Sequence, residues 1–263
     1  MYPFTYHRPG SLADAVKLAG SDEAKIMAGG MTLLPTMKQR LAAPSDIVDL
    51  NGLDLAGIKV EGGKVTIGAM TRHADVAGNA DLHKAIPALA ELAGMIGDPM
   101  VRHRGTIGGS VSNNDPAADY PSACLALGAT IVTSKREMAA EDFFTGLFET
   151  ALEPGEIVTK FVFPVPEKAN YQKFRNPASR YAIVGVFVAK FAAGVRVAVT
   201  GAGSSGVFRQ FDFEEALSKI FSTQAIEGIK QSADGLNSDI HADAAYRAHL
   251  IGVMARRAVE AAR

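Results

Sequence analysis

Residues 24–35, AKIMAGGMTLLP, join a short apolar run to a pair of glycines and then to the start of a helix. The run predicts a strand that ends at Gly29 and Gly30, followed by a helix over 33–41. Thr32 stands where its side chain can cap that helix. A strand, a glycine turn and a helix in this order are typical of an α/β unit.

The neighbouring sequence completes this unit on both sides. Ser11 opens a helix as the first residue of a capping box, and Gly20 can end it. Residues 46–50, DIVDL, predict a second strand. We therefore expect an α/β lobe over residues 1–57.

Beyond this lobe the pattern changes to alternating strands. Two runs, 58–61 and 64–68, flank Gly62-Gly63 and predict a hairpin. Helical sequence follows over 71–96, interrupted near Gly78 and Pro87, and the segment 106–121 is turn-rich and polar after an apolar start. Three further elements are expected: a helix over 121–127 and strands over 130–133 and 156–163.

A second region begins after a linker at 164–168, PVPEK. Residues 183–191 form a nearly continuous apolar run, which predicts a strand buried on both faces, and 195–200 predicts another strand. Helices are expected at about 213–222 and 242–262. The fold class is therefore α+β.

Composition excludes several classes of protein. The 263 residues include 27 Lys+Arg against 28 Asp+Glu, so neither a nucleic-acid-binding tract nor an acidic tail dominates. The one cysteine, Cys124, can form no internal disulfide and cannot complete a four-cysteine cluster or zinc site. No signal peptide and no run of about 18 apolar residues is present, so we expect a cytoplasmic chain without a transmembrane segment.

Three glycine-rich segments can bind an anion, and they differ in context. Residues 28–32 place glycines between a strand and a helix, where backbone N–H groups can turn toward a phosphate; the alternative is a plain βα turn without a ligand. In residues 106–119, TIGGSVSNNDPAAD, we expect the two glycines to expose backbone N–H groups, and the Ser and Asn that follow need solvent or a polar ligand; the alternative is an exposed loop. Residues 201–206 match G-x-G-x-x-G literally, but no helix follows directly, so we expect a plain turn there.

No catalytic residue and no metal site is expected. Pro116 and Pro121 interrupt any helix that would align Asp115 with Asp119, so an acid–base pair is not predicted. The six histidines show no ligand spacing, and Cys124 lies in an apolar run typical of a packed thiol.

Residues 28–35 and 106–119, taken in this order, resemble the FAD-binding medium subunit of the molybdenum hydroxylases, the family of xanthine dehydrogenase and aerobic carbon monoxide dehydrogenase. The similarity continues through the Gly-Glu-Ile of 155–157, the YQKFR of 171–175 and the AIVGV of 182–186. It extends over essentially the whole chain.

The resemblance implies a fold and a division into domains. The expected fold is a two-lobed FAD-binding domain of the PCMH (vanillyl-alcohol-oxidase) type over 1–167, with lobes at 1–57 and 58–167. A smaller α+β domain over 168–263, a sheet with helices, would close over the flavin.

The resemblance also implies a set of cofactor-binding residues. The first motif would cradle the FAD pyrophosphate, the second would contact a phosphate and the ribityl chain, Asp119 would be an acidic contact, Ile96 and Ile157 apolar contacts, and Lys173 or Arg175 a basic one. The full set is Ala28, Gly29, Gly30, Met31, Thr32, Ile96, Thr106, Gly108, Gly109, Ser110, Asp119, Ile157, Lys173 and Arg175.

This sequence departs from the family pattern at three points. Met31-Thr32 replaces a common His-Ser, which keeps the hydroxyl but loses one donor, and Ser110 replaces a common Asn. The cysteine-rich insertion that binds an additional iron–sulfur cluster in one branch is missing.

The function implied is electron transfer through noncovalently bound FAD. Electrons would arrive from [2Fe–2S] clusters on a small partner subunit, after hydroxylation at a molybdopterin cofactor on a large subunit, and leave to an external acceptor. The assembly implied is a dimer of heterotrimers. Two alternatives remain: a self-contained flavoenzyme of the same fold with its own substrate pocket, and a non-enzymatic α/β binding module.

Overall fold

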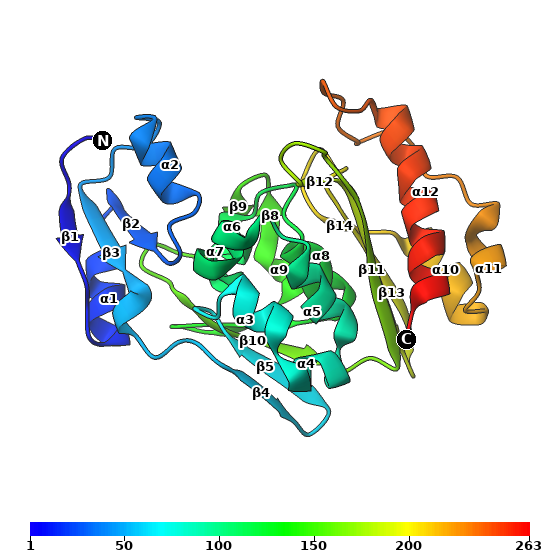
Figure 1. Cartoon of the computed structure of the whole chain (residues 1–263), viewed down its shortest axis with the longest axis horizontal. Coiled ribbons are helices and arrows are strands. Elements are labelled where there is room, and N and C mark those ends of the chain that lie inside the picture. Colours follow the sequence, from blue (N-terminus) through cyan, green and yellow to red (C-terminus); the bar gives the residue numbers. More distant parts are fainter.

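The computed structural model describes all 263 residues, which fold around three sheets and one additional hairpin (Figure 1). The first sheet belongs to the N-terminal lobe, the second to the middle of the chain and the third to the C-terminal part. The arrangement is α+β, as the sequence predicted.

The N-terminal lobe is a small parallel sheet with strand order β1-β3-β2. Its elements are β1 (Thr5–His7), α1 (Leu12–Ala19), β2 (Ala24–Met27), α2 (Leu33–Lys38), β3 (Asp46–Asp49) and a short 3₁₀ turn (Leu50–Gly52). Ser11 caps α1 by accepting a hydrogen bond from the backbone N–H of Asp14, which confirms the capping prediction. Val48 packs into an apolar cluster that Met70 and Ile157 of the next lobe complete.

The middle of the chain forms an antiparallel sheet with strand order β4-β5-β10-β6-β7. Its strands are β4 (Ile58–Glu61), β5 (Lys64–Gly68), β6 (Thr130–Thr133), β7 (Glu137–Ala139) and β10 (Val158–Pro164). The predicted hairpin is present, with Gly62 and Gly63 at φ of +55° and +71°, where glycine avoids the steric penalty of a side chain.

Helices connect and cover this sheet. They are α3 (His73–Gly78), α4 (Ala80–Ala85), α5 (Pro87–Gly94), α6 (Pro99–Arg104), α7 (Ile107–Asn113), α8 (Tyr120–Ala126) and α9 (Ala140–Phe143), followed by the hairpin β8 (Phe144–Gly146) and β9 (Glu149–Thr150). The segment 106–121, which its composition marks as turn-rich, contains the helix α7, so the alternative of an exposed loop does not hold there. Ile107 and Val111, one helical turn apart, are fully buried, so packing overrides the weak helix propensity of Gly, Ser and Asn.

The C-terminal part is an antiparallel sheet with strand order β11-β12-β13-β14. Its elements are β11 (Lys168–Arg175), β12 (Ala182–Phe191), β13 (Gly194–Thr200), β14 (Phe208–Arg209), α10 (Phe211–Lys219), α11 (Thr223–Glu227) and α12 (Ala244–Ala261). Helices α10 and α12 pack on one face of this sheet. Helices α5 and α8, which belong to the middle of the chain, pack against its other face (Figure 1). This two-sided packing explains the continuous apolar run of β12.

None of the helices combines the length and the apolar composition needed to cross a membrane.

Candidate functional site

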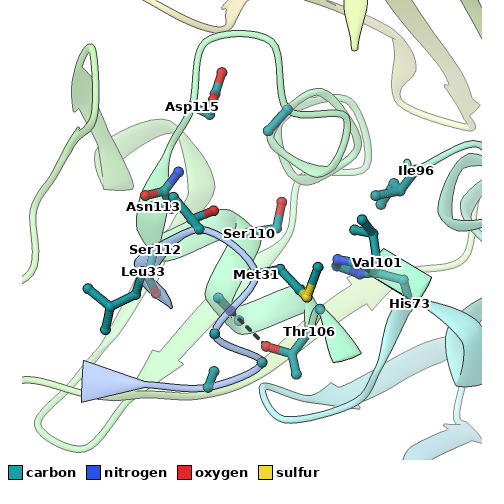
Figure 2. Close-up of a pocket in the computed structure, with 18 of the residues that line it drawn as sticks. Met31, Leu33, His73, Ile96, Val101, Thr106, Ser110, Ser112, Asn113 and Asp115 are labelled. Carbon is teal, nitrogen blue, oxygen red and sulfur yellow. Dashed lines mark hydrogen bonds between the residues drawn. The ribbon is translucent and has the colours of Figure 1, made fainter. Parts of the chain in front are cut away.

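A cavity of about 750 Å³ is lined by residues of both lobes and of the C-terminal sheet. Its walls come from the loop between β2 and α2, from α6 and α7, from the segment before β10, and from β11 with the loop that follows it. Figure 2 shows the parts that the β2–α2 loop, α6 and α7 contribute. This volume lies within the range of about 300–1,000 Å³ that small-molecule and cofactor sites occupy.

The loop from Ala28 to Thr32 presents unpaired backbone donors to the cavity. No backbone N–H from Gly29 to Thr32 donates a hydrogen bond within the chain. Gly30 has a φ of +74°, the left-handed conformation that occurs in backbone loops whose successive N–H groups bind an anion. Asn51 fixes the start of the loop by donating to the carbonyl of Ala28 at 3.0 Å. The loop therefore has the unpaired donors and the left-handed glycine that are typical of an anion-binding loop.

Gly29 rests directly on the second lobe. A Cβ atom at Gly29 would overlap the carbonyl oxygen of Arg104 and lie 2.8 Å from the Cα of Gly105. Only glycine allows this approach, so the first motif is held against the loop that precedes α7.

Thr32 lies at the start of α2, but its side chain makes no capping hydrogen bond, contrary to the sequence prediction. Thr32 lines the cavity together with the residues that carry the free N–H groups. The hydroxyl is therefore available to a ligand. Met31 lies in the same lining and is 37% exposed.

The second motif differs from the expectation that its glycines expose N–H groups. The N–H of Ile107 donates to Thr71 at 3.1 Å, that of Gly108 to Ala69 at 2.8 Å, and that of Gly109 to the Thr106 hydroxyl at 3.0 Å. These bonds occupy the first amides of α7. A Cβ at Gly108 would lie 2.6 Å from the Ala69 carbonyl oxygen, so this glycine allows close packing of α7.

Polar side chains of α7 and the following turn nevertheless line the cavity. Figure 2 shows Ser110, Ser112, Asn113 and Asp115 along one wall, opposite the end that holds Ile96 and Val101. The cavity thus has a polar wall of hydroxyl, amide and carboxyl groups and a more apolar end.

A buried ion pair joins α8 to the C-terminal sheet at the cavity. The Nζ of Lys173 lies 2.8 Å from Oδ2 of Asp119, and the hydroxyl of Tyr171 donates to Oδ1 at 2.5 Å. Lys173 also donates to the carbonyl of Met95 at 3.3 Å. Burial raises the pKa of Asp119, while the ammonium of Lys173 and both hydrogen bonds favour the ionised carboxylate.

The remaining residues predicted from the family resemblance lie as follows. Ile96 and the 2%-exposed Ile157 line the cavity, and Arg102 fixes the carbonyl of Ile96 by a 3.0 Å hydrogen bond. Arg175 is exposed and is not part of the lining. Of the two basic candidates, the structure therefore brings Lys173 to the cavity.

Two cavity features were missed by the sequence interpretation. His73, at the start of α3, lines the apolar end. Ser179, Arg180 and Tyr181 also line the cavity, and Tyr181, which carries an aromatic ring, is 49% exposed. These residues belong to no glycine motif. Residues 178–181 lie in the loop between β11 and β12, and because the sequence analysis predicted no strand at β11, nothing drew attention to this loop.

The third glycine segment, 201–206, lies outside the cavity lining. The N–H of Gly201 donates to the carbonyl of Pro116 at 2.8 Å, and α10 does not begin until Phe211. The prediction of a turn without a following helix is confirmed.

Free backbone donors, a polar wall and a more apolar end are features that suit the diphosphate, sugar-like chain and ring systems of a dinucleotide. Residues 2–166 match the family described as the FAD binding domain in molybdopterin dehydrogenase. The chain belongs to this family.

Relatives and solved structures agree with this assignment. The chain is 36% identical to the carbon monoxide dehydrogenase medium chain of Afipia carboxidovorans, over 99% of this chain and 96% of that one. It is 34% identical to the nicotine 6-hydroxylase medium subunit of Paenarthrobacter nicotinovorans, over 97% and 95%. A solved carbon monoxide dehydrogenase chain from Hydrogenophaga pseudoflava superposes with a TM-score of 0.89 at 34% identity, over 99% and 98%. The chain is thus the FAD-binding subunit of a molybdenum-containing oxidoreductase of several subunits, which confirms the resemblance.

Proposed function

We propose that this chain holds FAD noncovalently in the 750 Å³ cavity and passes electrons from a partner subunit's [2Fe–2S] clusters to an external acceptor. The observation that carries the placement is the set of unpaired backbone N–H groups from Gly29 to Thr32 at the cavity wall. Four adjacent donors without an acceptor in the chain fit the pyrophosphate of a dinucleotide.

The other lining residues fit the rest of the cofactor. The hydroxyls of Thr32, Thr106 and Ser110 suit the second phosphate and the ribityl chain. Gly108 and Gly109 have no side chain, so the start of α7 can lie close to its neighbours and to the cofactor. Ile96 and Ile157 give apolar contacts to the isoalloxazine ring. FAD, when bound, supplies the capacity to accept and release electrons, and the protein sets its position and electrostatics.

Lys173 is the residue we assign to charge stabilisation. Its side chain is 3% exposed, and its ammonium is held by Asp119 and by the carbonyl of Met95, next to Ile96. A fixed cation at the ring stabilises negative charge that develops there when electrons arrive. Asp119 orients the cation and offsets its burial. Arg175, exposed outside the lining, has no part in this assignment.

The partners follow from what the chain lacks and from the naming of its relatives as medium chains. A single cysteine cannot bind an iron–sulfur cluster. We assign the molybdopterin to a large subunit and the [2Fe–2S] clusters to a small one, in a dimer of heterotrimers in the cytoplasm. Within the chain, we place the boundary of the two domains between residues 167 and 168.

Acid precipitation of the purified protein tests noncovalent binding. All yellow colour is expected in the supernatant. His73 is the one histidine of the cavity lining, and Cys124 is fully buried elsewhere. Colour that remains in the pellet and disappears in His73→Leu would contradict the proposal.

A further inference from the structure

His73 is a cavity residue that none of the sequence motifs includes. It begins α3, and its backbone N–H donates to the carbonyl of Gly105 at 3.0 Å. The residue is 4% exposed and forms part of the cavity lining. Figure 2 shows its side chain beside Val101, on the side of the cavity where Met31 lies.

The imidazole has hydrogen-bonding capacity that the chain leaves unused. Its Nδ1 is buried without a partner, and so is the hydroxyl of Tyr120, whose ring centroid lies 5.4 Å from that of His73. A buried polar atom without a partner costs about 1–3 kcal/mol, and such atoms are rare in native proteins. Tyr120 is fully buried and outside the lining, whereas His73 borders the cavity.

The position of the ring is enforced by its neighbours. A Cβ at Gly105 would lie 2.6 Å from Nε2 of His73, so the imidazole fills space that only glycine leaves open. The ring of Tyr120 supports it from another side. The ring is therefore held in place. Because Nδ1 is enclosed, the nitrogen left for a ligand in the cavity is Nε2, which has no hydrogen-bond partner within the chain.

The ring is neutral at neutral pH. Burial, and next the nearby charge of Arg102, lower the pKa of His73 to about 4. A neutral imidazole carries one donor and one acceptor, and it brings no positive charge to a pyrophosphate. Its surroundings are apolar, since Ile96 and Val101 line the same end of the cavity (Figure 2). A flat nitrogen heterocycle, with an apolar face and a polar edge, fits this environment.

We propose that His73 hydrogen-bonds the edge of the isoalloxazine ring of FAD, whose face rests on Ile96 and Val101. This inference rests on the proposed function, because it needs FAD in the cavity. It assigns a binding residue outside both glycine motifs.

The test compares the full-length apoprotein with its His73→Leu and His73→Gln variants by FAD titration and by thermal unfolding without ligand. We expect His73→Leu to weaken FAD binding about tenfold, while its ligand-free form unfolds at a higher temperature because an unpaired polar atom has gone. His73→Gln places a donor and an acceptor at about the reach of Nε2 and should recover most of the affinity. Titrations with FMN and with ADP check the ring: FMN, which contains the isoalloxazine, should lose affinity in His73→Leu, whereas a loss for ADP instead would contradict this placement.

The matched control is His249→Leu, at an exposed position of α12 outside the cavity lining, which should bind FAD as the unchanged chain does. A purely structural histidine would give the opposite pattern: lower stability without ligand and unchanged FAD affinity. That result overturns the inference and leaves the proposed function standing. Failure of the unchanged chain to bind FAD overturns both.

Discussion

The ammonium of Lys173 lies 2.8 Å from a carboxylate oxygen of Asp119, with side chains 3% and 5% exposed. The two residues are far apart in the sequence, one on β11 and the other at the start of α8. Their contact joins the C-terminal sheet to the wall of the cavity.

Removing the cation should destabilise the protein and weaken FAD binding together. In Lys173→Met the aliphatic part of the side chain remains, but Asp119 keeps only Tyr171 and stays buried. Breaking a buried pair on one side costs about 3–5 kcal/mol. Urea unfolding and FAD titration measure the two effects.

The control for this variant is Lys59→Met, which removes an exposed pair with Glu61, with side chains 68% and 65% exposed. Exposed pairs contribute at most about 1 kcal/mol. Equal losses in the two lysine variants would contradict the role assigned to Lys173.

Gly29→Ala should empty the site. The added Cβ overlaps the Arg104 carbonyl oxygen, so the loop with the free N–H groups must move away from the second lobe. We expect the purified variant to contain little FAD by absorbance. In Gly78→Ala the Cβ meets nothing within 4 Å, so that variant should keep its FAD.

Gly109→Ala should lower FAD affinity through the start of α7. Its Cβ would lie 3.0 Å from the Thr106 hydroxyl and 3.5 Å from the Cβ of Ala28, between the two motifs. Gly252→Ala, in α12, adds a Cβ at an ordinary 3.5 Å contact with Arg256 and is the matched control. Gly203→Ala is not a suitable control, because its Cβ would overlap the carbonyl of Gly206 and disturb folding. Unchanged FAD affinity in Gly109→Ala would contradict this account of α7.

Glu156 should make stability depend on acid pH. Its buried carboxylate accepts hydrogen bonds from Thr133 at 2.6 Å and Arg136 at 3.0 Å. Burial alone would raise its pKa, but these hydrogen bonds outweigh burial and lower the pKa from 4.5 to about 2. A carboxyl whose pKa is depressed by folding stabilises the protein above its unfolded pKa, and that contribution is lost as pH falls toward 2.

Glu156→Gln should therefore cost about 2 kcal/mol at pH 7 and less at pH 3. Urea unfolding at several pH values checks this. The exposed Glu61→Gln serves as control and should change little at any of them. A constant difference between Glu156→Gln and the unchanged chain across this range would contradict the assignment.

Local patterns in the sequence predicted much of the fold. The strand, Gly-Gly turn and helix of the first motif, the hairpin at Gly62-Gly63 and the buried strand β12 each depend on neighbours in sequence, so periodicity and turn residues identify them. Helix α7 could not be predicted in this way, because Gly, Ser and Asn are poor helix formers and its stability comes from burying Ile107 and Val111.

The site was predicted only where it follows local motifs or the family pattern. The free N–H groups of 29–32 match the expectation from the first motif. The occupied N–H groups of Ile107, Gly108 and Gly109 do not, because their acceptors in 69–71 and the Thr106 side chain are set by packing. The choice between Lys173 and Arg175, and the place of His73, depend on contacts between distant segments that no spacing reveals.

Electron transfer into the bound flavin is tested most directly by anaerobic stopped-flow mixing of the FAD-loaded chain with its reduced iron–sulfur partner subunit. The flavin absorbance at about 450 nm reports the reduction of the flavin. We predict rapid loss of this band on mixing, and no turnover of organic substrates by the isolated chain. A band that persists after mixing, or an isolated chain that turns over an organic substrate at about 1–10³ s⁻¹, would contradict the electron-transfer role and favour a self-contained flavoenzyme.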